Sequence, residues 1–426
     1  MKKLILGLMF PIIAFGQYTS IPDSMFEERL IDLGYDTIHD GQVLTADIVN
    51  IDTLILENPH IQGTFSFTYG PISDLTGIED FSNLTYLDCS GGNQIDTLDL
   101  SQNPTLTYLN CSGDGWIFKQ ILSLNISQNT ALSHLNCNST LLSQLDLSQN
   151  PNLTFLDCMD TELQILDLSH NIGLLNLDCS HSILLQTLFT GNPVTHLTNL
   201  DLSQNINLTS INCYGNALSS LDLSQNINLT SLNCSDNQLQ ILDLSQNIGL
   251  VNLDCGNDIW GDFDNTNQLT NLDVSQNVAL KYLDCGYNKL TSLDVRNGNN
   301  INFTGFDATQ NDSLICISVD DSTWSDNNWQ NIDSHTSFSN DCNPSTVNII
   351  EIEKNLSVYP NPTNEEITIS INNFNGNIQT EVYDFIGNRL HTTNKTTISL
   401  RDYSLGIYLL KVTYGDRVQE VKVIKD

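Results

Sequence analysis

Nine cysteines recur through the middle of the chain, and they are the residues best suited to do chemistry. The interval is 21 residues in two runs of three. The nine are Cys89, Cys111, Cys137, Cys158, Cys179, Cys213, Cys234, Cys255 and Cys285. In-register strands lie about 4.8 Å apart, which is farther than the roughly 3.5 to 4.5 Å between disulfide Cβ atoms. A straight file of thiols also cannot surround zinc tetrahedrally. We therefore expect a ladder of buried free thiols that pack as small apolar groups.

A row of aspartates is the second set of candidate ligands, and each stands between two apolar residues. The row is Asp146, Asp167, Asp201, Asp222, Asp243, Asp273 and Asp294. In-register carboxylates about 5 Å apart repel by about 1 kcal/mol per pair in water-like surroundings. Calcium or a basic ligand would relieve that repulsion, and so would solvation with hydrogen bonds from neighbouring Ser and Asn. The first five are candidate calcium ligands, and no other cofactor is expected.

Short catalytic motifs are absent from the sequence. There is no His-Glu-x-x-His pair, no Gly-x-Ser-x-Gly turn and no phosphate-binding Gly-Lys-Ser loop. The eight histidines are scattered, and none recurs with the cysteines. The sequence favours a protein that is not an enzyme.

The cysteines belong to a repeat, LxxLxCxxNxLxxLDLSxNxx, that extends over about ten units of residues 84–311. This unit resembles a short leucine-rich repeat. A single coil cannot close an apolar core, so each coil stacks its leucines on its neighbours. The LxC and LDL triplets alternate with the two-residue period of a strand. The prediction is a mainly β solenoid of 21-residue coils with two parallel sheets.

Asparagines define one turn of each coil more strictly than the other. Three residues beyond the LDL-type triplets stand Asn103, Asn129, Asn150, Asn171, Asn205, Asn226, Asn247 and Asn277. At the same offset after the LxC triplet, the pattern gives only Asn216, Asn237 and Asn288. A buried Asn can satisfy turn amides and carbonyls coil after coil. One edge of the solenoid is therefore specified tightly and the other loosely.

Three insertions fall at the loose edge and carry candidate binding residues. The distance from a cysteine to the next triplet, usually 10 residues, becomes 15 after Cys111, 23 after Cys179 and 19 after Cys255. Insertions that gather on one face of a solenoid often mark its binding side. The candidate binding residues are Trp116, Phe118, His181, Phe189, His196, Trp260 and Phe263. Exposed aromatics suit protein contacts or sugar rings, and the alternative is that they fold back to cover the rim.

The amino terminus indicates an exported protein, and the acidic charge limits the partners that it can have. Lys2 and Lys3 precede an apolar run that is too short to span a membrane, and a small-x-small pattern predicts cleavage before Gln17. Residues 17–355 carry 42 acidic against six basic side chains. Such a charge repels nucleic acid and anionic lipid. No integral membrane segment is expected in the mature chain.

Both ends of the repeat require caps. Residues 17–83 are predicted to form an amino-terminal cap with a short helix and irregular first coils. The helix begins at Asp23 or Ser24, carries Phe26, Leu30 and Ile31 on one apolar face, and stops at Gly34. Residues 312–342 form the other cap. Cys316 and Cys342 lie outside the ladder and are expected to form a disulfide, with free thiols as the alternative.

A change in composition marks a further domain. A linker at 343–354 leads to 355–426, where short alternating strands and Asn-Gly and Gly-Asp turns predict a small β-sandwich. The region carries Tyr359, Pro360, Asn361 and Pro362 near its start, then Gly406 and Tyr408 before an apolar strand, and a VKVIKD end. With these motifs it resembles the Por-type, type A sorting domain of the type IX secretion system of Bacteroidetes-type bacteria. The resemblance implies an interaction with that secretion machinery, and secretion or attachment at the outer-membrane surface.

The sequence as a whole predicts an exported binding protein. A signal peptide at 1–16 and the sorting domain deliver a leucine-rich-repeat solenoid that recognises an extracellular protein or glycan, with adhesion as one such role. The alternative is a passive structural protein of the surface coat without a dedicated ligand.

Overall fold

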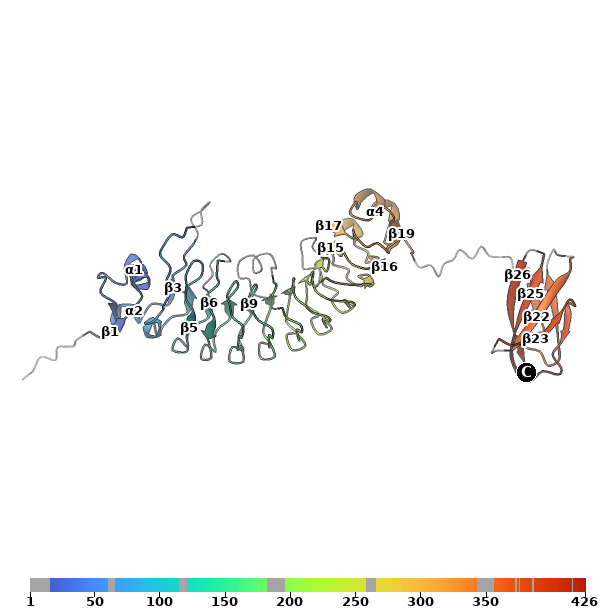
Figure 1. Ribbon diagram of the computed structural model, residues 1–426, viewed down its shortest axis with the longest axis horizontal. Helices are drawn as coiled ribbons and strands as arrows, with labels where there is room; N and C mark the ends of the chain where they lie inside the picture. The colour runs from blue at the N-terminus through green and yellow to red at the C-terminus, as the bar shows by residue number, and fades with distance from the viewer. Residues whose placement is uncertain are drawn as a thin grey trace, which may run out of the picture. The chain divides into compact units, whose positions relative to one another are not determined.

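The computed structural model describes residues 16–59, 66–114, 121–181, 196–257, 266–342, 356–371, 374, 376–384, 387–415 and 417–426. The chain divides into two compact units between Cys342 and Asn343 (Figure 1). The signal peptide predicted at 1–16 lies almost wholly outside the described residues. Among the described helices, none has the length and apolar character needed to cross a membrane.

A cap precedes the first coil. Its elements are β1 (Tyr18–Ser20), α1 (Ser24–Asp32), β2 (Gln42–Leu44), α2 (Thr45–Ile48) and the short 3₁₀ helix η1 (Ile78–Asp80). Asp23 caps α1 by accepting the N–H groups of Met25 and Phe26, and Gly34 beyond its end has a φ of +80°. The rings of Phe26 and Phe81 stack with centroids 6.4 Å apart, which attaches the helix to the solenoid core.

One long parallel sheet runs through the solenoid. Within the described residues it has eleven strands, which we call the long sheet. They are β3 (Thr53–Ile55), β4 (Tyr86–Asp88), β6 (Tyr108–Asn110), β8 (His134–Asn136), β9 (Phe155–Asp157), β10 (Asn176–Asp178), β11 (Ser210–Asn212), β12 (Ser231–Asn233), β13 (Asn252–Asp254), β15 (Tyr282–Asp284) and β17 (Gly305–Asp307). Neighbouring strands pair without a register shift, for example Leu232 with Leu253. Like residues therefore stack on like residues from coil to coil.

A second parallel sheet is present, as predicted, but within the described residues it is divided into two parts. Its strands are β5 (Thr97–Asp99) with β7 (Ser123–Asn125), and β14 (Asn271–Asp273), β16 (Ser292–Asp294), β18 (Cys316–Ser318) and β19 (Ser337–Ser339). In the five coils between, no strand is formed at the triplets that end at Leu147, Leu168, Leu202, Leu223 and Leu244. In those coils the carbonyl at the end of the triplet accepts an Asn side chain from the next coil, as Leu202 does from Asn226 at 3.2 Å. The same link is present beside the paired strands β5 and β7, where Asn129 donates to the carbonyl of Leu100 at 3.1 Å, so it continues without a break through the coils that lack the ladder.

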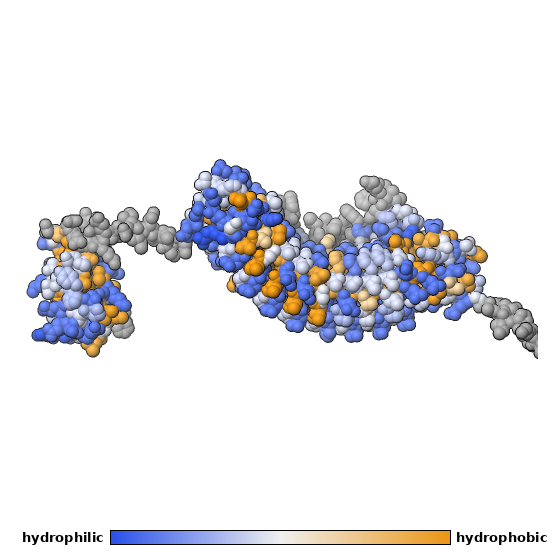
Figure 2. Space-filling view, turned by 180° about the vertical axis from the view of Figure 1, so that it is seen from behind, coloured by the Kyte–Doolittle hydropathy of each residue, from blue (hydrophilic) through white to orange (hydrophobic). Residues whose placement is uncertain are grey.

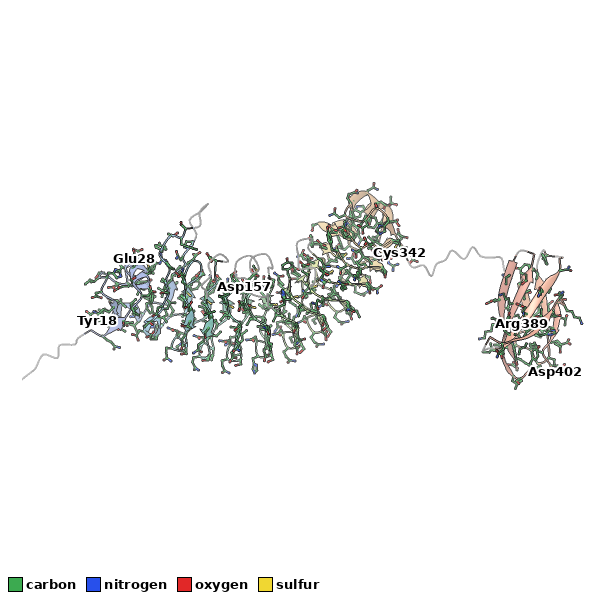
Figure 3. All side chains as sticks on the ribbon, in the orientation of Figure 1. Tyr18, Glu28, Asp157, Cys342, Arg389 and Asp402 are labelled. Carbon is green, nitrogen blue, oxygen red and sulfur yellow. A yellow bond between two sulfur atoms is a disulfide. The ribbon has the colours of Figure 1, made fainter. Side chains whose placement is uncertain are left out.

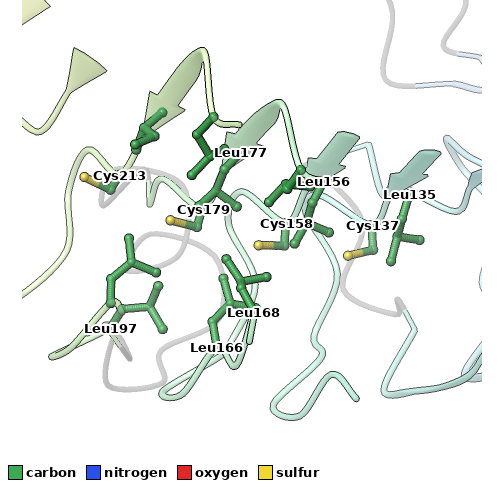
Figure 4. Packing of buried hydrophobic residues seen from close by; sticks show 14 of the residues in the cluster. Leu135, Cys137, Leu156, Cys158, Leu166, Leu168, Leu177, Cys179, Leu197 and Cys213 are labelled. Carbon is green, nitrogen blue, oxygen red and sulfur yellow. The ribbon is translucent and has the colours of Figure 1, made fainter. Parts of the chain in front are cut away.

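The core is a continuous column of leucine and cysteine. In one coil, Leu229, Leu232, Cys234, Leu239 and Leu244 are each at most 1% exposed. Burial of a leucine side chain contributes about 1.5 to 3 kcal/mol. Figure 4 shows Cys137, Cys158, Cys179 and Cys213 side by side, each from a successive coil and next to the leucines.

The carboxy-terminal cap closes the column with aromatic rings and a disulfide. It contains the 3₁₀ helix η2 (Asn300–Asn302) and α4 (Ser322–Asn328), which Asp321 caps. Trp329 stacks on Phe306 at 4.1 Å between centroids and contacts Phe338 at 5.7 Å. Cys316 and Cys342 are joined, which confirms the predicted disulfide.

The second unit consists of two antiparallel sheets over one core. The strands are β20 (Leu356–Tyr359), β21 (Glu366–Ile371) and β24 (Thr397–Ser399) in one sheet, and β22 (Ile378–Asp384), β23 (Arg389–Thr393), β25 (Gly406–Tyr414) and β26 (Arg417–Lys425) in the other. Ile367 and Ile369 of the first sheet share a buried cluster with Val382, Leu410 and Val412 of the second. This is the small β-sandwich that the alternating pattern predicts.

Candidate functional site

The outward face of the long sheet presents two columns of side chains. Each strand has three residues, and the middle one, a leucine in most strands, points into the core. The first and third residues of every strand therefore point outward. Strict register places each first residue beside another first residue, and each third beside another third.

The first-position column carries four stacked aromatic rings, which we call the aromatic stack: Tyr86, Tyr108, His134 and Phe155. The centroids of successive rings are 4.1, 4.3 and 4.1 Å apart, and their planes differ by 6° to 9°. Each ring covers the face of the next, so the stack presents mainly ring edges to solvent. Burial lowers the pKa of His134 and raises that of Tyr108 to about 12. Both rings are therefore uncharged at neutral pH.

The third-position column is acidic and amide-rich. Beyond Ile55 of β3, its members are Asp88, Asn110, Asn136, Asp157, Asp178, Asn212, Asn233, Asp254, Asp284 and Asp307. Amides relieve part of the repulsion, because Asn110 Nδ2 donates to Asp88 Oδ2 at 3.1 Å and Asn212 Nδ2 donates to Asp178 Oδ2 at 2.9 Å. Burial and the neighbouring Asp178 raise the pKa of Asp157, which Figure 3 labels. A cation placed along this column would offset those charges.

Sequence reasoning missed the aromatic stack although a signal was present. Each of its four rings stands three residues before a ladder cysteine, in four consecutive coils. The repeat pattern treats that position as variable, and only the structure shows that its side chains meet.

The predicted rim residues are placed only in part. Trp116, Phe118, Phe189, Trp260 and Phe263 lie outside the described residues. The structure brings the other two together: His181 and His196 meet edge to face with centroids 5.1 Å apart. His181 is only 3% exposed, and its Nδ1 lies 3.9 Å from Asp160 Oδ1. These two histidines are the predicted rim residues that the structure describes, and they lie at the base of the middle insertion.

The aspartates of the LDL triplets accept hydrogen bonds from the turns that follow them. Oδ1 of Asp201 accepts the N–H of Ser203 at 2.9 Å, and Asp222 and Asp243 bond Ser224 and Ser245 in the same way. Asp146 and Asp167 repeat the arrangement with the serines that follow them. Hydrogen bonds from the side chains and the backbone N–H groups of these serines lower the pKa of all five carboxyls. Within the described ranges no three acidic, His or Cys side chains meet as a metal site needs, and calcium binding stays a prediction.

The cysteine ladder forms as the spacing predicts. All nine thiols are free and buried. Burial raises the pKa of the Cys213 thiol to about 12 and raises those of its neighbours Cys179 and Cys234 well above the ordinary value. Because the thiolate is the reactive form, this environment makes the ladder inert.

The predicted sorting residues hold one end of the β-sandwich. Asn361 donates from Nδ2 to the carbonyl of Lys422 at 2.7 Å and accepts the N–H of Ile424 at 2.9 Å. The hydroxyl of Tyr408 donates to the carbonyl of Ser404 at 2.6 Å. Lys425 is buried and donates to three backbone carbonyls, those of Leu400, Arg401 and Tyr403. The signature residues at the start and end of this unit therefore bond to its last strand and to the turn before β25.

Comparisons with known proteins agree with both units. The family model described as the secretion system C-terminal sorting domain matches residues 357–426. The functional domain of InlJ from Listeria monocytogenes, described as including a cysteine ladder, is similar with 27% identity and a TM-score of 0.53. The similarity covers 96% of this chain and 99% of that one. An internalin (inlF) from the same organism is 18% identical over 76% of this chain and 96% of its own, with a TM-score of 0.41. No curated protein matches the sequence.

Proposed function

The chain is a secreted or surface-attached leucine-rich-repeat protein with a type IX secretion sorting domain, and we propose that it binds an extracellular protein on the outward face of its long sheet. The observation that supports this proposal most is the aromatic stack beside an acidic column. The protein acts by binding and not by catalysis, and its sorting domain engages the secretion machinery.

The geometry of the rings favours a protein over a glycan. Sugars bind aromatic side chains by lying flat on ring faces, but the inner faces here are covered at 4.1 to 4.3 Å. What remains is a line of ring edges with the polar atoms of Tyr86, Tyr108 and His134. Such amphipathic groups suit a protein contact, because they combine apolar area with hydrogen-bonding capacity.

The charge of the neighbouring column favours a basic ligand. Asp157 and Asp284 have raised pKa values because burial and a neighbouring aspartate disfavour their charged forms. A Lys or Arg side chain placed between Asp157 and Asp178, or between Asp284 and Asp307, would offset the repulsion within that pair. The repeat region also contains few basic residues of its own, so steering of a basic partner is expected.

An array of basic, neutral and acidic peptides together with immobilised glycans tests the proposal, with the purified chain as the probe. We expect retention on basic peptides that falls as salt rises. The paired substitution Tyr108→Ala and His134→Ala should weaken that retention at least about tenfold through loss of the central contact area. The matched control is Ile165→Ala with Ile241→Ala, two side chains that are 78% exposed and lie outside the long sheet.

Three results would contradict this assignment. They are retention on glycans alone, retention on no peptide or glycan, and equal loss in the test and control variants. Replacement of the three rim insertions by ten-residue connections is expected to leave peptide retention unchanged. If retention disappears with the insertions alone, the rim is the binding surface and the sheet face is not.

A further inference from the structure

A row of exposed aliphatic side chains follows the edge of the solenoid at which the LDL triplet turns back to the long sheet. The row occupies the position after the buried turn asparagine in five consecutive described coils, and we call it the ridge. Its members are Ile172, Ile206, Ile227, Ile248 and Val278, each between 51% and 58% exposed. Figure 2 shows exposed apolar residues gathered along this part of the solenoid.

The ridge is rigid because each turn is bonded to the next. Asn207 donates from Nδ2 to the carbonyl of Ile172 at 3.0 Å, and Asn228 donates to that of Ile206 at 3.2 Å. The coils repeat at about 4.8 Å, so the five side chains extend over about 20 Å. A preformed apolar line of this kind loses little conformational entropy when it is covered.

The turns that carry the ridge are also uncharged. Residues 203–207, 224–228, 245–249 and 275–279 contain no Asp, Glu, Lys or Arg, in a repeat region that is otherwise strongly acidic. Anionic surfaces are repelled by the whole protein, and a basic partner gains most on its acidic faces. The repulsion between two copies at the ridge therefore comes from the aspartates that precede these turns, such as Asp201, and not from the turns themselves.

We propose that the ridge is a self-association surface whose occupant is the ridge of a second copy. A twofold axis at Ile227 would place Ile206 against Ile248 and Ile172 against Val278, so the same line of residues serves both partners. Two arrays with one repeat length also keep their side chains in register along the whole contact. This surface is separate from the long sheet, so its test is independent of ligand binding.

The size of the ridge predicts a weak association. Five half-exposed aliphatic side chains form a patch of the order of 300 to 600 Å², the largest that a soluble monomer usually exposes. A pair of such patches buries less than the roughly 1,600 Å² of a standard stable interface. Association should therefore need high local concentration, as at a crowded cell surface.

Sedimentation equilibrium of the purified full chain tests the proposal in low and high salt. We expect a monomer–dimer equilibrium that strengthens as salt screens the repulsion between acidic copies. The triple substitution Ile206→Thr, Ile227→Thr and Ile248→Thr should weaken dimerisation at least about tenfold, because it removes apolar area from the centre of the contact. The control pair Ile165→Thr and Ile241→Thr should change it less than about twofold.

A cross-linking measurement tests the predicted axis. Ile227→Cys should form disulfide-linked dimers at least about tenfold faster than Ile241→Cys, because only residue 227 faces its own copy across a twofold axis. The buried ladder thiols do not compete. A chain that stays monomeric throughout, equal weakening in ridge and control variants, or equal cross-linking rates would each overturn the proposal.

Discussion

The two edges of the solenoid both link one coil to the next with asparagine side chains, but the cysteine edge adds backbone bonds between coils. At the cysteine edge, which follows the ladder cysteines, backbone hydrogen bonds join neighbouring coils. The N–H of Cys234 donates to the backbone carbonyl of Asp254 at 2.8 Å, and that of Asp236 donates to the backbone carbonyl of Gly256 at 3.2 Å. At the turn edge, which carries the buried asparagines, the backbone N–H of Asn226 bonds within its own coil, to Leu223. There the side chain makes the link, from Nδ2 of Asn226 to the carbonyls of Leu202 and Asn205.

This difference explains why one edge varies and the other does not. Every turn-edge link needs an amide at one fixed position, and the chain of bonds from Asn103 to Asn277 is continuous through the described coils. At the cysteine edge the comparable position is Thr140 in one coil, Thr161 in the next and Asn237 later. Backbone links let the loop between them change in length and sequence.

The sharpest way to break the comparison is an insertion at each edge. Five Gly and Ser residues between Gln225 and Asn226 should remove the asparagine from its site and cost more than about 4 kcal/mol of unfolding free energy, because buried carbonyls lose their donors in an otherwise dry core. The same five residues between Asp236 and Asn237 should cost about 1 kcal/mol, because backbone bonds still hold this edge and Asn237 can return to its site, as Asn267 does after the insertion that precedes it. Urea unfolding of the purified chain measures both. Similar losses at the two sites would refute the distinction.

A single-residue exchange sharpens the same point. Asn226→Thr should cost about 3 kcal/mol, since a threonine hydroxyl cannot reach the two carbonyls of the preceding coil. Asn237→Thr should cost less, about 2 kcal/mol: it loses the bonds to Cys213 and Leu218, but a threonine hydroxyl can keep the bond to the cysteine of its own coil, as Thr140 and Thr161 do. Unfolding midpoints in urea compare the two. A larger loss for Asn237→Thr would reverse the order of the edges.

The features that depend on residue spacing could be predicted from the sequence. The cysteine ladder, the turn asparagines and the disulfide between Cys316 and Cys342 depend on spacing that is visible in the letters. The amino-terminal helix begins at a capping Asp23 and stops before Gly34 because those residues have strong local preferences.

What the sequence could not predict depends on contacts between variable positions. Asn267 comes at the end of an insertion, far from the regular offset. Its Nδ2 nevertheless donates to the carbonyls of Cys234 and Cys255, just as that of Asn237 donates to Cys213 and Cys234. Asn93 and Asn311 fill the same place and were also missed. The second sheet is interrupted although the asparagine links are the same inside and outside the gap, and the repeated triplets on which the prediction depends do not distinguish the coils that lack a strand.

The ladder at the cysteine edge makes its own smaller prediction. Cys234→Ser places a hydroxyl in the apolar column and should cost about 1 to 3 kcal/mol, whereas Cys234→Ala only removes a small buried group and should cost about 1 kcal/mol. In the unmodified chain, a thiol reagent should react with the nine ladder cysteines only after unfolding. Rapid labelling of the native chain would show that the column is open to solvent.

Aspartates beside the two edges should respond to pH in opposite directions, and this is the smallest effect. Burial and Asp307 raise the pKa of Asp284, next to the cysteine edge. The folded state therefore holds that proton more tightly than the unfolded chain, whose Asp pKa is about 3.9, and stability falls as pH rises from that value through the raised pKa. Asp284→Asn should add less than about 1 kcal/mol at pH 7 and nothing near pH 3.

Asp201, next to the turn edge, supplies the opposite case. The N–H of Ser203 lowers its pKa, so its stabilising effect is present above the unfolded pKa and is lost as pH falls through the folded one. Asp201→Asn should therefore lower the melting temperature at pH 7, where Asp284→Asn raises it. Thermal melts of both variants at pH 7 and near pH 3 decide the matter. A shift of the same sign at pH 7 would mean that the local hydrogen bonds, and not the burial of one carboxylate, govern both sites.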